Sequence, residues 1–392
     1  MHATAPAGVL TVAIVGCALL AGCAAGSTIT EAPASTHMVA QPTAATSAPT
    51  TAPSTPRALT PRPATPAPTP VRWGDAALVH GTEACMADHL TVSPPDPTGT
   101  VRARDATITC QMDFNDQRVS GIKTGPFEFD GWGTLSDGSF VQWGSPRTIT
   151  NDGGTWVGWF TGAYTSETGD LITAWYEGTG AYEGLTFFEW IAGSGSSYPV
   201  TGLIYPGMPP VEAGDLAGPA TGRPVDPPAS PAATTAPGRA LPKPASWGDA
   251  VHVQGWEICT PINEVFPSPD PNGVSRLRGA SLDCTLEFND PRLSGTKKGP
   301  YAGDAWGSED GGAVVIWSPE QRIENAAGAW VGTMSGVFTS PTGEMISAWF
   351  EGTGAYEGLS FFEWIGVPGG AGPSGYAVTG LIFPGKPPVP NP

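Results

Sequence analysis

The sequence predicts an all-β protein with two tandem antiparallel β-barrel domains of about eight strands each. Helix signals are nearly absent, because no stretch keeps apolar residues at a helical spacing for several turns. Short runs rich in Val, Ile, Thr, Trp, Tyr and Phe are instead separated by Gly and Asp-Gly turns, as in consecutive β-hairpins. The chain also repeats itself at an offset of 174 residues, and residues 171–191 match residues 345–365 at 17 of 21 positions. We therefore expect two copies of one self-sufficient folding unit.

The chain begins with an apolar leader, residues 1–22, which has no charged residue and runs into Leu20-Ala21-Gly22-Cys23. This ending resembles the lipobox of bacterial lipoproteins. The resemblance implies cleavage before Cys23, a diacylglyceryl group with fatty acids such as palmitate on the Cys23 thiol, and an extracytoplasmic protein anchored to the bacterial cell membrane. The leader is too short and too interrupted for a good transmembrane helix. A generic secretory signal peptide cut elsewhere, such as after Ala25, is the alternative.

Two segments are predicted to be disordered, the tether 23–71 and the linker 211–245. Residues 24–70 consist mainly of Pro, Thr, Ala and Ser and contain no aromatic residue, so they cannot bury enough apolar surface to fold. At ~3 Å per residue, the tether has a maximal reach on the order of 140 Å. The folded repeats are then residues 72–210 and 246–390.

Four cysteines follow the leader, two in each repeat at the same spacing. An even number of cysteines in an exported domain predicts disulfides. Because each repeat should fold alone, we expect Cys85 to pair with Cys110 and Cys259 with Cys284. Each bridge would close a loop of about 25 residues and stabilise the fold by on the order of 3 kcal/mol. No CxxC motif occurs and the repeats share no histidine, so we expect no metal and no cofactor.

Both repeats are acidic. Residues 72–210 carry 16 acidic and 6 basic side chains, a net charge of −10, and residues 246–390 carry 16 and 7, a net charge of −9. Nucleic acid and anionic lipid headgroups are unfavourable partners for such surfaces, because phosphate binding needs a patch of Lys and Arg. The simplest interpretation of the acidity is solubility.

The strand signals can be placed in the first repeat. Strands are predicted near residues 106–114, 129–135, 139–144, 155–164, 170–178, 185–191 and 199–205. Asp137-Gly138 and Thr168-Gly169 indicate hairpin turns between them. Gly158 and Gly162 alternate with large residues in one strand, and glycines at this spacing allow the bends that a closed barrel needs. These features favour a barrel over a two-layer sandwich.

A glycine-rich hairpin in each repeat points to a family. The run GTGAYEGL occupies residues 178–185 and is repeated at residues 352–359. It resembles the hairpin of allene oxide cyclase and dirigent-type β-barrels. The resemblance implies an eight-stranded antiparallel barrel with an apolar central cavity. No catalytic residue is carried over, because the glycines of this motif serve to turn the chain tightly.

The most aromatic part of each repeat supplies the candidate site residues. Ligand-binding candidates are Trp175, Glu177, Phe187 and Glu189, with their copies Trp349, Glu351, Phe361 and Glu363. In residues 185–191 both faces are apolar, and Glu189 shares a face with Phe187. If that face lines a barrel interior, burial would raise the pKa of Glu189, and Glu189 and Glu363 become candidates for an acid/base residue or a ligand anchor. The alternative is a solvated carboxylate, or one paired with an arginine present in both repeats.

Other shared residues favour structural roles. Arginines 102, 104 and 118 recur as residues 276, 278 and 292, and ion pairs between strands explain them better than a carboxylate-binding clamp. Most tryptophans also recur, with Trp159 as an exception because Thr333 replaces it. Recurring tryptophans are more often core residues than ligand platforms, although a row of exposed ones would favour sugar stacking.

Together these features predict a lipid-anchored cell-envelope protein with duplicated barrels. We expect non-catalytic binding of a small apolar ligand, or of a protein or cell-wall partner. The alternatives are an isomerase- or cyclase-like enzyme that uses a cavity glutamate, a glycan-binding module and a purely structural surface module. The sequence contains none of the common hydrolase, nucleotide-binding or metal-binding motifs.

Overall fold

The computed structural model describes residues 69–134, 136–195, 197–210, 241–308, 311–367 and 375–388. The predicted leader, Cys23, nearly all of the tether and most of the linker 211–245 lie outside these ranges. Every regular element within them is a β-strand, so the all-β prediction is confirmed. No helix in the described ranges is long and apolar enough to cross a bilayer.

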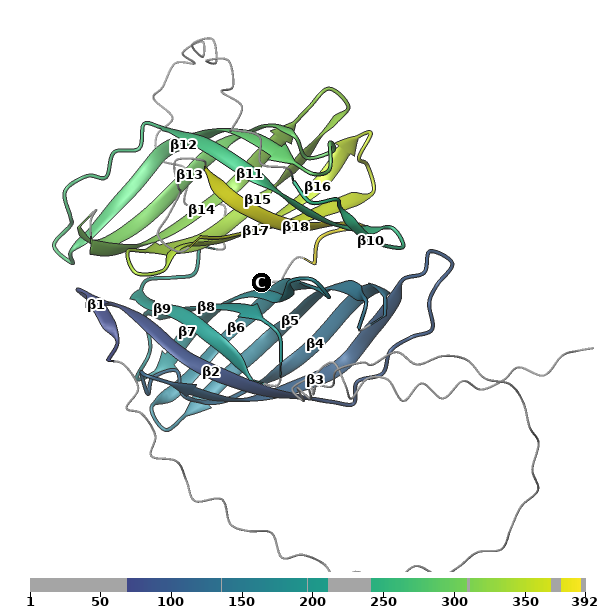
Figure 1. Cartoon of the computed structure of the whole chain (residues 1–392). Helices are drawn as coiled ribbons and strands as arrows, with labels where there is room; N and C mark the ends of the chain where they lie inside the picture. The colour runs from purple at the N-terminus through teal and green to yellow at the C-terminus, as the bar shows by residue number, and fades with distance from the viewer. Residues whose placement is uncertain are drawn as a thin grey trace, which may run out of the picture.

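The first repeat forms a closed antiparallel barrel of eight strands (Figure 1). The strands are β2 (Ala76–Asp88), β3 (Val101–Phe114), β4 (Gly121–Gly133), β5 (Gly138–Asn151), β6 (Gly154–Thr165), β7 (Gly169–Gly180), β8 (Leu185–Gly193) and β9 (Tyr198–Pro206). Each strand pairs with the next along the chain, and β2 pairs with β9 to close the barrel. A short strand, β1 (Val71–Trp73), adds to the free edge at the start of β2.

The second repeat has the same topology. Its strands are β10 (Ala245–Trp247), β11 (Ala250–Ile262), β12 (Val274–Phe288), β13 (Gly295–Ser308), β14 (Gly311–Glu324), β15 (Gly328–Thr339), β16 (Gly343–Gly354), β17 (Leu359–Val367) and β18 (Tyr376–Pro384). Pairing of β11 with β18 closes this barrel. The prediction of two tandem antiparallel barrels of about eight strands is therefore confirmed.

The seven predicted strands of the first repeat correspond to β3 to β9, and the structure extends most of them by several residues. The strand that the sequence did not reveal is β2, whose sequence AALVHGTEACMAD lacks a clear alternation of β-branched and polar residues. Gly158 is required by the close approach of two strands, which differs from the bend that the sequence suggested. A Cβ atom at Gly158 would lie 1.8 Å from the main-chain oxygen of Trp175, so only glycine lets β6 approach β7 this closely.

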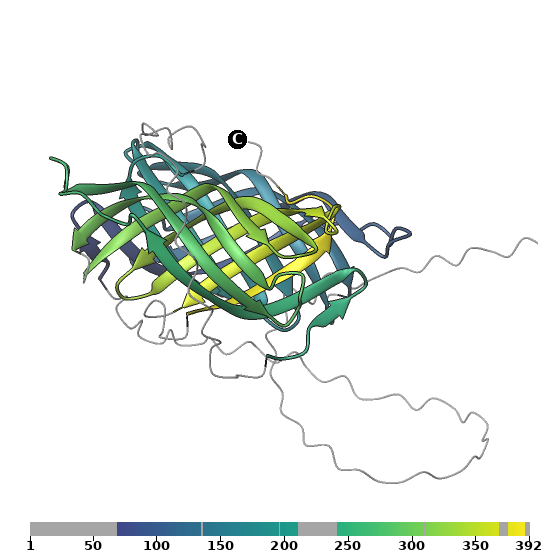
Figure 2. The same ribbon diagram turned by 90° about the horizontal axis from the view of Figure 1, so that it is seen from above.

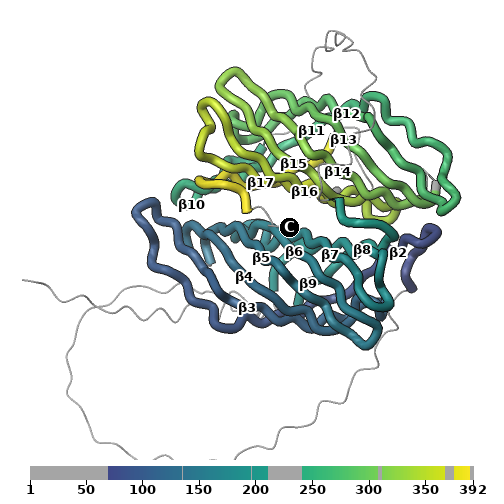
Figure 3. Tube along the Cα trace, turned by 180° about the vertical axis from the view of Figure 1, so that it is seen from behind, coloured from purple at the N-terminus to yellow at the C-terminus, as the bar shows by residue number. Residues whose placement is uncertain are grey.

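Each barrel has its own core, and a third core joins the two barrels. Phe187 and Trp156 belong to the interior of the first barrel, and Phe361 and Trp330 to the interior of the second. The third cluster combines outward-facing residues of both barrels. Figures 2 and 3 show the second barrel lying directly against the first. Each repeat thus has a complete barrel and core of its own, and the two barrels also share one apolar layer.

The shared layer has approximate two-fold symmetry. Trp190 and its copy Trp364 stack on each other, and the hydroxyls of the equivalent residues Thr173 and Ser347 lie 3.1 Å apart. Two further aromatic contacts cross the same interface and are counterparts of each other: Trp132 of β4 with Phe383 of β18, and Trp306 of β13 with Tyr205 of β9. This layer explains why both faces of residues 185–191 are apolar: one face fills the barrel and the other packs against the second barrel.

Candidate functional site

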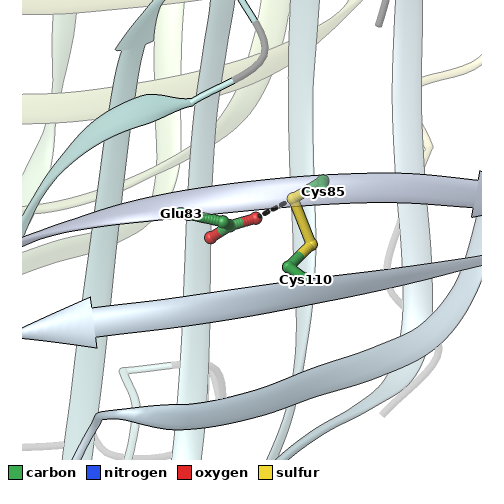
Figure 4. A group of neighbouring side chains, drawn as sticks. All are labelled: Glu83, Cys85 and Cys110. Atoms are coloured by element: carbon green, nitrogen blue, oxygen red, sulfur yellow. Dashed lines mark hydrogen bonds between the residues drawn. A yellow bond between two sulfur atoms is a disulfide. The ribbon is translucent and has the colours of Figure 1, made fainter. Parts of the chain in front are cut away.

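A disulfide and a carboxyl group lie side by side on the inner wall of the first barrel (Figure 4). Cys85 in β2 is bonded to Cys110 in β3, and Cys259 is bonded to Cys284 at the same place in the second barrel, as expected. Oε1 of Glu83 lies 2.7 Å from Sγ of Cys85. Glutamate and cysteine at such spacing could hold a metal ion. Here the disulfide consumes both thiols, and a metal would need a thiolate ligand.

The centre of the first barrel holds a buried ion-pair cluster. The ammonium group of Lys123, in β4, contacts Glu83 and lies 2.9 Å from Oε2 of Glu189, in β8. All three side chains are almost completely inaccessible to solvent. The hydroxyl of Tyr176, in β7, donates a hydrogen bond of 3.2 Å to Glu189. Buried charges are tolerated only when they are paired and hydrogen-bonded, and this cluster meets that requirement.

The second barrel repeats the cluster with one change. Nζ of Lys297 lies 3.0 Å from Glu257 and 2.8 Å from Glu363. Phe350 stands where the first barrel has Tyr176, so the tyrosine hydroxyl is missing. Lys297 contacts only Oε2 of Glu363, and Oε1 of Glu363 has no hydrogen-bond partner among the described residues.

In each barrel, two carboxyls share one lysine, and one of the two holds a proton more tightly than usual. Burial, together with the nearby Glu189, raises the pKa of Glu83 to about 7 against the opposing effect of Lys123. Burial acts on Glu189 in the same direction, but Lys123, Glu83 and Arg147 together outweigh it and hold the pKa of Glu189 below its ordinary value. In the second barrel burial raises the pKa of Glu363 to about 8. A hydrogen bond with Glu83 and the positive charge of Arg147 also favour the Glu189 carboxylate, and the second barrel has Gln321 in place of Arg147.

A pocket opens beside this cluster in the first barrel. Its volume is about 80 Å³, and Glu83 and Lys123 form part of its wall, whereas Glu189 does not. Most of the wall is apolar and comprises Phe127, Phe129, Phe140, Phe160, Ile172, Leu90 and Val92. A largely apolar pocket with a few convergent polar groups is the usual form of a small-molecule site.

Arg147 faces this pocket because β5 is irregular. The register between β5 and β6 shifts between Gly144 and Arg147. Before the shift Phe140 and Gln142 face the interior, and after it Arg147 and Ile149 do. A bulge of this kind changes which side chains of a strand face inward.

The guanidinium of Arg147 is buried without an acidic partner. Arg147 is only 4% exposed, and its Cζ lies 4.3 Å from the ring centroid of Phe160. Its Nη2 lies 3.8 Å from Sγ of Cys110, and its Nε has no hydrogen-bond partner in the structure. It forms no ion pair with a carboxylate of the described residues. Buried arginines are normally paired, so the pocket contains unused hydrogen-bond donors.

Another buried carboxyl, that of Asp170, lines the same pocket. Burial raises the pKa of Asp170 to about 6, although Asp170 accepts a hydrogen bond of 2.7 Å from Nε2 of Gln142 and a further bond from Tyr198. All three residues line the pocket. The carboxyl of Asp170 is thus satisfied within the wall.

The second barrel differs at the positions equivalent to this pocket, although it keeps the lysine and both glutamates of the ion-pair cluster. Gln321 stands in place of Arg147 and Met334 in place of Phe160. Three further positions differ: Gly303 replaces Phe129, Tyr301 replaces Phe127, and Ile316 replaces Gln142. The two interiors therefore offer different chemistry, and only the first carries the buried guanidinium.

The structure separates the sequence-predicted candidates into two groups. Phe187, Glu189, Phe361 and Glu363 are buried inside the barrels. Trp175 and Trp349 face outward and pack in the layer between the barrels, and Glu177 and Glu351 are exposed. The prediction therefore combined residues from the inner and the outer faces of β7 and β8 into a single site.

Trp175 and Glu177 line a groove of about 650 Å³ between the barrels. Trp159 from the first barrel and Trp317 from the second also line it, together with Arg276 and Arg278. Both arginines pair with Asp304, at 2.9 Å each. These contacts, and the bidentate pair of Arg118 with Asp116, agree with the interpretation of the shared arginines as structural ion pairs.

The sequence analysis did not identify three residues of the site, namely Glu83, Lys123 and Arg147. A signal existed for the first two, because they recur as Glu257 and Lys297 at the 174-residue offset in a chain that is poor in lysine. Arg147 has no such signal, since its copy is Gln321 and its inward direction depends on the irregularity in β5.

The chain was compared with protein-family models, with curated proteins and with solved structures, and none of them matched.

Proposed function

We propose that the protein is a non-catalytic binding protein of the bacterial cell envelope, and that its first barrel holds a small, largely apolar ligand. The observation that carries the proposal is the pocket walled by Phe127, Phe140 and Phe160 beside the buried charges. Both oxygens of Glu189 are within hydrogen-bond distance of Lys123, and Glu189 is outside the pocket wall. This arrangement favours binding over acid/base catalysis by Glu189, because a catalytic group must reach the reacting proton.

The location is a separate proposal, in which acylated Cys23 anchors the barrels to the membrane through the tether. The leader sequence supports it, and the disulfides agree with an oxidising compartment. Cys23→Ala should move the protein from the membrane fraction to the soluble fraction. Unchanged fractionation would contradict the anchor and leave the pocket proposal intact.

The pocket can be tested with xenon, which enters apolar cavities without regard to charge. Crystals under xenon pressure should show an anomalous peak between Phe127, Phe140 and Phe160. The variant Ile172→Trp should remove this peak by filling the pocket, while Ile346→Trp changes the equivalent residue of the second barrel and should leave it in place. Native mass spectrometry of protein from its own host should also find a bound small molecule. A pocket without xenon and a protein without a ligand would reject the proposal.

The groove between the barrels favours a second candidate function, the binding of an envelope glycan. The half-buried Trp159 and Trp317 place two aromatic side chains along it, and the exposed Glu177 adds a polar group. Aromatic faces beside polar groups suit sugar rings. Trp159→Thr introduces the residue found in the second repeat and should weaken retention on isolated cell-wall polysaccharide. Equal retention of both proteins would reject this candidate.

A further inference from the structure

The pocket of the first barrel contains a guanidinium that has no carboxylate among the described residues within ion-pair distance. Arg147 is buried and has no acidic partner among the described residues, and its Nε has no hydrogen-bond partner. Phe160 covers one face of the guanidinium, which leaves the N–H groups in the plane of the guanidinium for other contacts. These N–H groups form a planar fork that matches the two oxygens of a carboxylate.

We propose that this pocket binds a small monocarboxylate, whose carboxylate accepts hydrogen bonds from Arg147 and whose short apolar part packs against Phe127, Phe140 and Phe160. This inference rests on the proposed function, since it names the chemical class of the ligand for the same pocket. A cavity of ~150 Å³ holds a benzene molecule, so a cavity of about 80 Å³ holds only a smaller ligand. That volume suits a short-chain acid.

The net charge of the barrel interior affects how strongly a carboxylate can bind there. Glu83, Glu189 and Asp170 carry three negative charges when ionised, and Lys123 and Arg147 carry two positive charges, so the sum is −1. The hydroxyls of Tyr164, Tyr176 and Tyr198, which also face this interior, are neutral because burial raises their pKa values. A second negative charge would be costly in this buried environment.

A proton entering with the ligand removes that cost. Glu83 is the natural acceptor, because its carboxyl lines the pocket and already holds a proton more tightly than an ordinary glutamate. Asp170 is a weaker acceptor, since Gln142 and Tyr198 satisfy its carboxylate. Binding of the carboxylate should therefore be stronger at pH 6 than at pH 8.

The test uses butyrate and its neutral analogue butyramide, titrated calorimetrically into the full chain purified in detergent. Butyrate should bind, and Arg147→Gln should weaken its binding roughly ten- to a hundredfold, the range for loss of a charge-assisted hydrogen bond. Arg147→Lys should restore part of the affinity. Binding of butyramide should change little in either variant. Because the second barrel has glutamine at this position, Arg147→Gln is compatible with the fold; a urea denaturation curve verifies this.

Proton uptake gives an independent measurement. At pH 7 the heat of butyrate binding should differ between phosphate and Tris buffers. Such a difference shows that the protein takes up a proton from the buffer when butyrate binds. Glu83→Gln should remove the difference and tighten binding at pH 8. The exposed Arg322 serves as a control, since Arg322→Gln should change neither quantity.

The outcomes separate the two proposals. Xenon in the pocket, combined with equal affinities for butyrate and butyramide or with no effect of Arg147→Gln, would overturn the carboxylate inference alone. Xenon in the pocket with no binding of either probe would overturn it as well. Absence of xenon, of both probes and of any co-purified ligand would reject the pocket as a binding site.

Discussion

The indole rings of Trp190 and Trp364 stack on each other with their centroids 3.5 Å apart and their planes inclined by 21°. The two residues are equivalent positions of the two repeats, so their contact lies on the approximate two-fold axis of the molecule. An interface of this kind, in which the same surface of each unit meets its copy, is the common form of a homodimer. In this chain the duplication has placed both partners of such an interface in one polypeptide.

Removal of one indole should destabilise the molecule. Trp190→Ala leaves a cavity in the shared layer and removes the stacking partner of Trp364, so we expect a loss of about 3–5 kcal/mol in the free energy of unfolding. Trp190→Phe keeps an aromatic ring and should cost less. Urea denaturation followed by tryptophan fluorescence measures both variants. If Trp190→Ala leaves the midpoint unchanged, the barrels do not depend on each other for stability.

Two neighbouring lysines of β13 offer a matched pair of variants. Lys297→Met leaves Glu257 and Glu363 buried without their cation, and breaking such a cluster costs about 3–5 kcal/mol. Lys298→Met removes only a half-exposed pair with Asp283, at 2.9 Å, and should cost less than about 1 kcal/mol. Thermal and urea unfolding at pH 7 compares them. Equal losses would show that the buried cluster contributes no more than a surface pair.

Stability should fall as the pH rises from about 5 to 8. Burial raises the pKa of Glu83 and Glu344 to about 7 and that of Glu363 to about 8, above the ordinary value of 4.5. The folded state therefore binds more protons than the unfolded state in this window. The stabilisation is complete below pH 4.5 and is lost as pH passes the folded-state pKa, by up to ~1.4 kcal/mol per pH unit for each proton.

Glu363→Gln should reduce this slope, because glutamine cannot release a proton, and Glu357→Gln at an exposed turn should leave it unchanged. Urea midpoints measured at intervals between pH 5 and 8 provide the comparison. A slope that is the same in the parent protein and in Glu363→Gln would show that Glu363 is ionised throughout this range.

The fold could be predicted from sequence because its determinants are local or repeated. Hairpin turns such as Asp137-Gly138 specify antiparallel neighbours, and Gly158 lets β6 lie close against β7. The duplication indicated the disulfide pairing, since each unit had to contain a complete pair. β2 escaped prediction because its strand conformation comes from pairing with β3 and β9 rather than from its own residues.

The site was less accessible to prediction for a different reason. Alternation along a strand assigns residues to two faces, but it does not say which face is inside a barrel when both are apolar. Trp175 and Phe187 were therefore placed in one site, although the layer between the barrels covers the first and the barrel interior holds the second. The inward direction of Arg147 depends on a one-residue irregularity at Pro146, and the sequence analysis did not use this proline as a sign of a bulge.

The most direct test of the account is the crystal structure of the protein soaked with butyrate at pH 6, compared with Arg147→Gln crystals soaked in the same way. The account predicts difference density for butyrate in the first barrel, with its carboxylate at Arg147 and its chain against Phe160. It predicts no butyrate in the Arg147→Gln crystals, or beside Gln321 in the second barrel. Density that is unaffected by Arg147→Gln, or a pocket that stays free of butyrate in the parent protein, would contradict it.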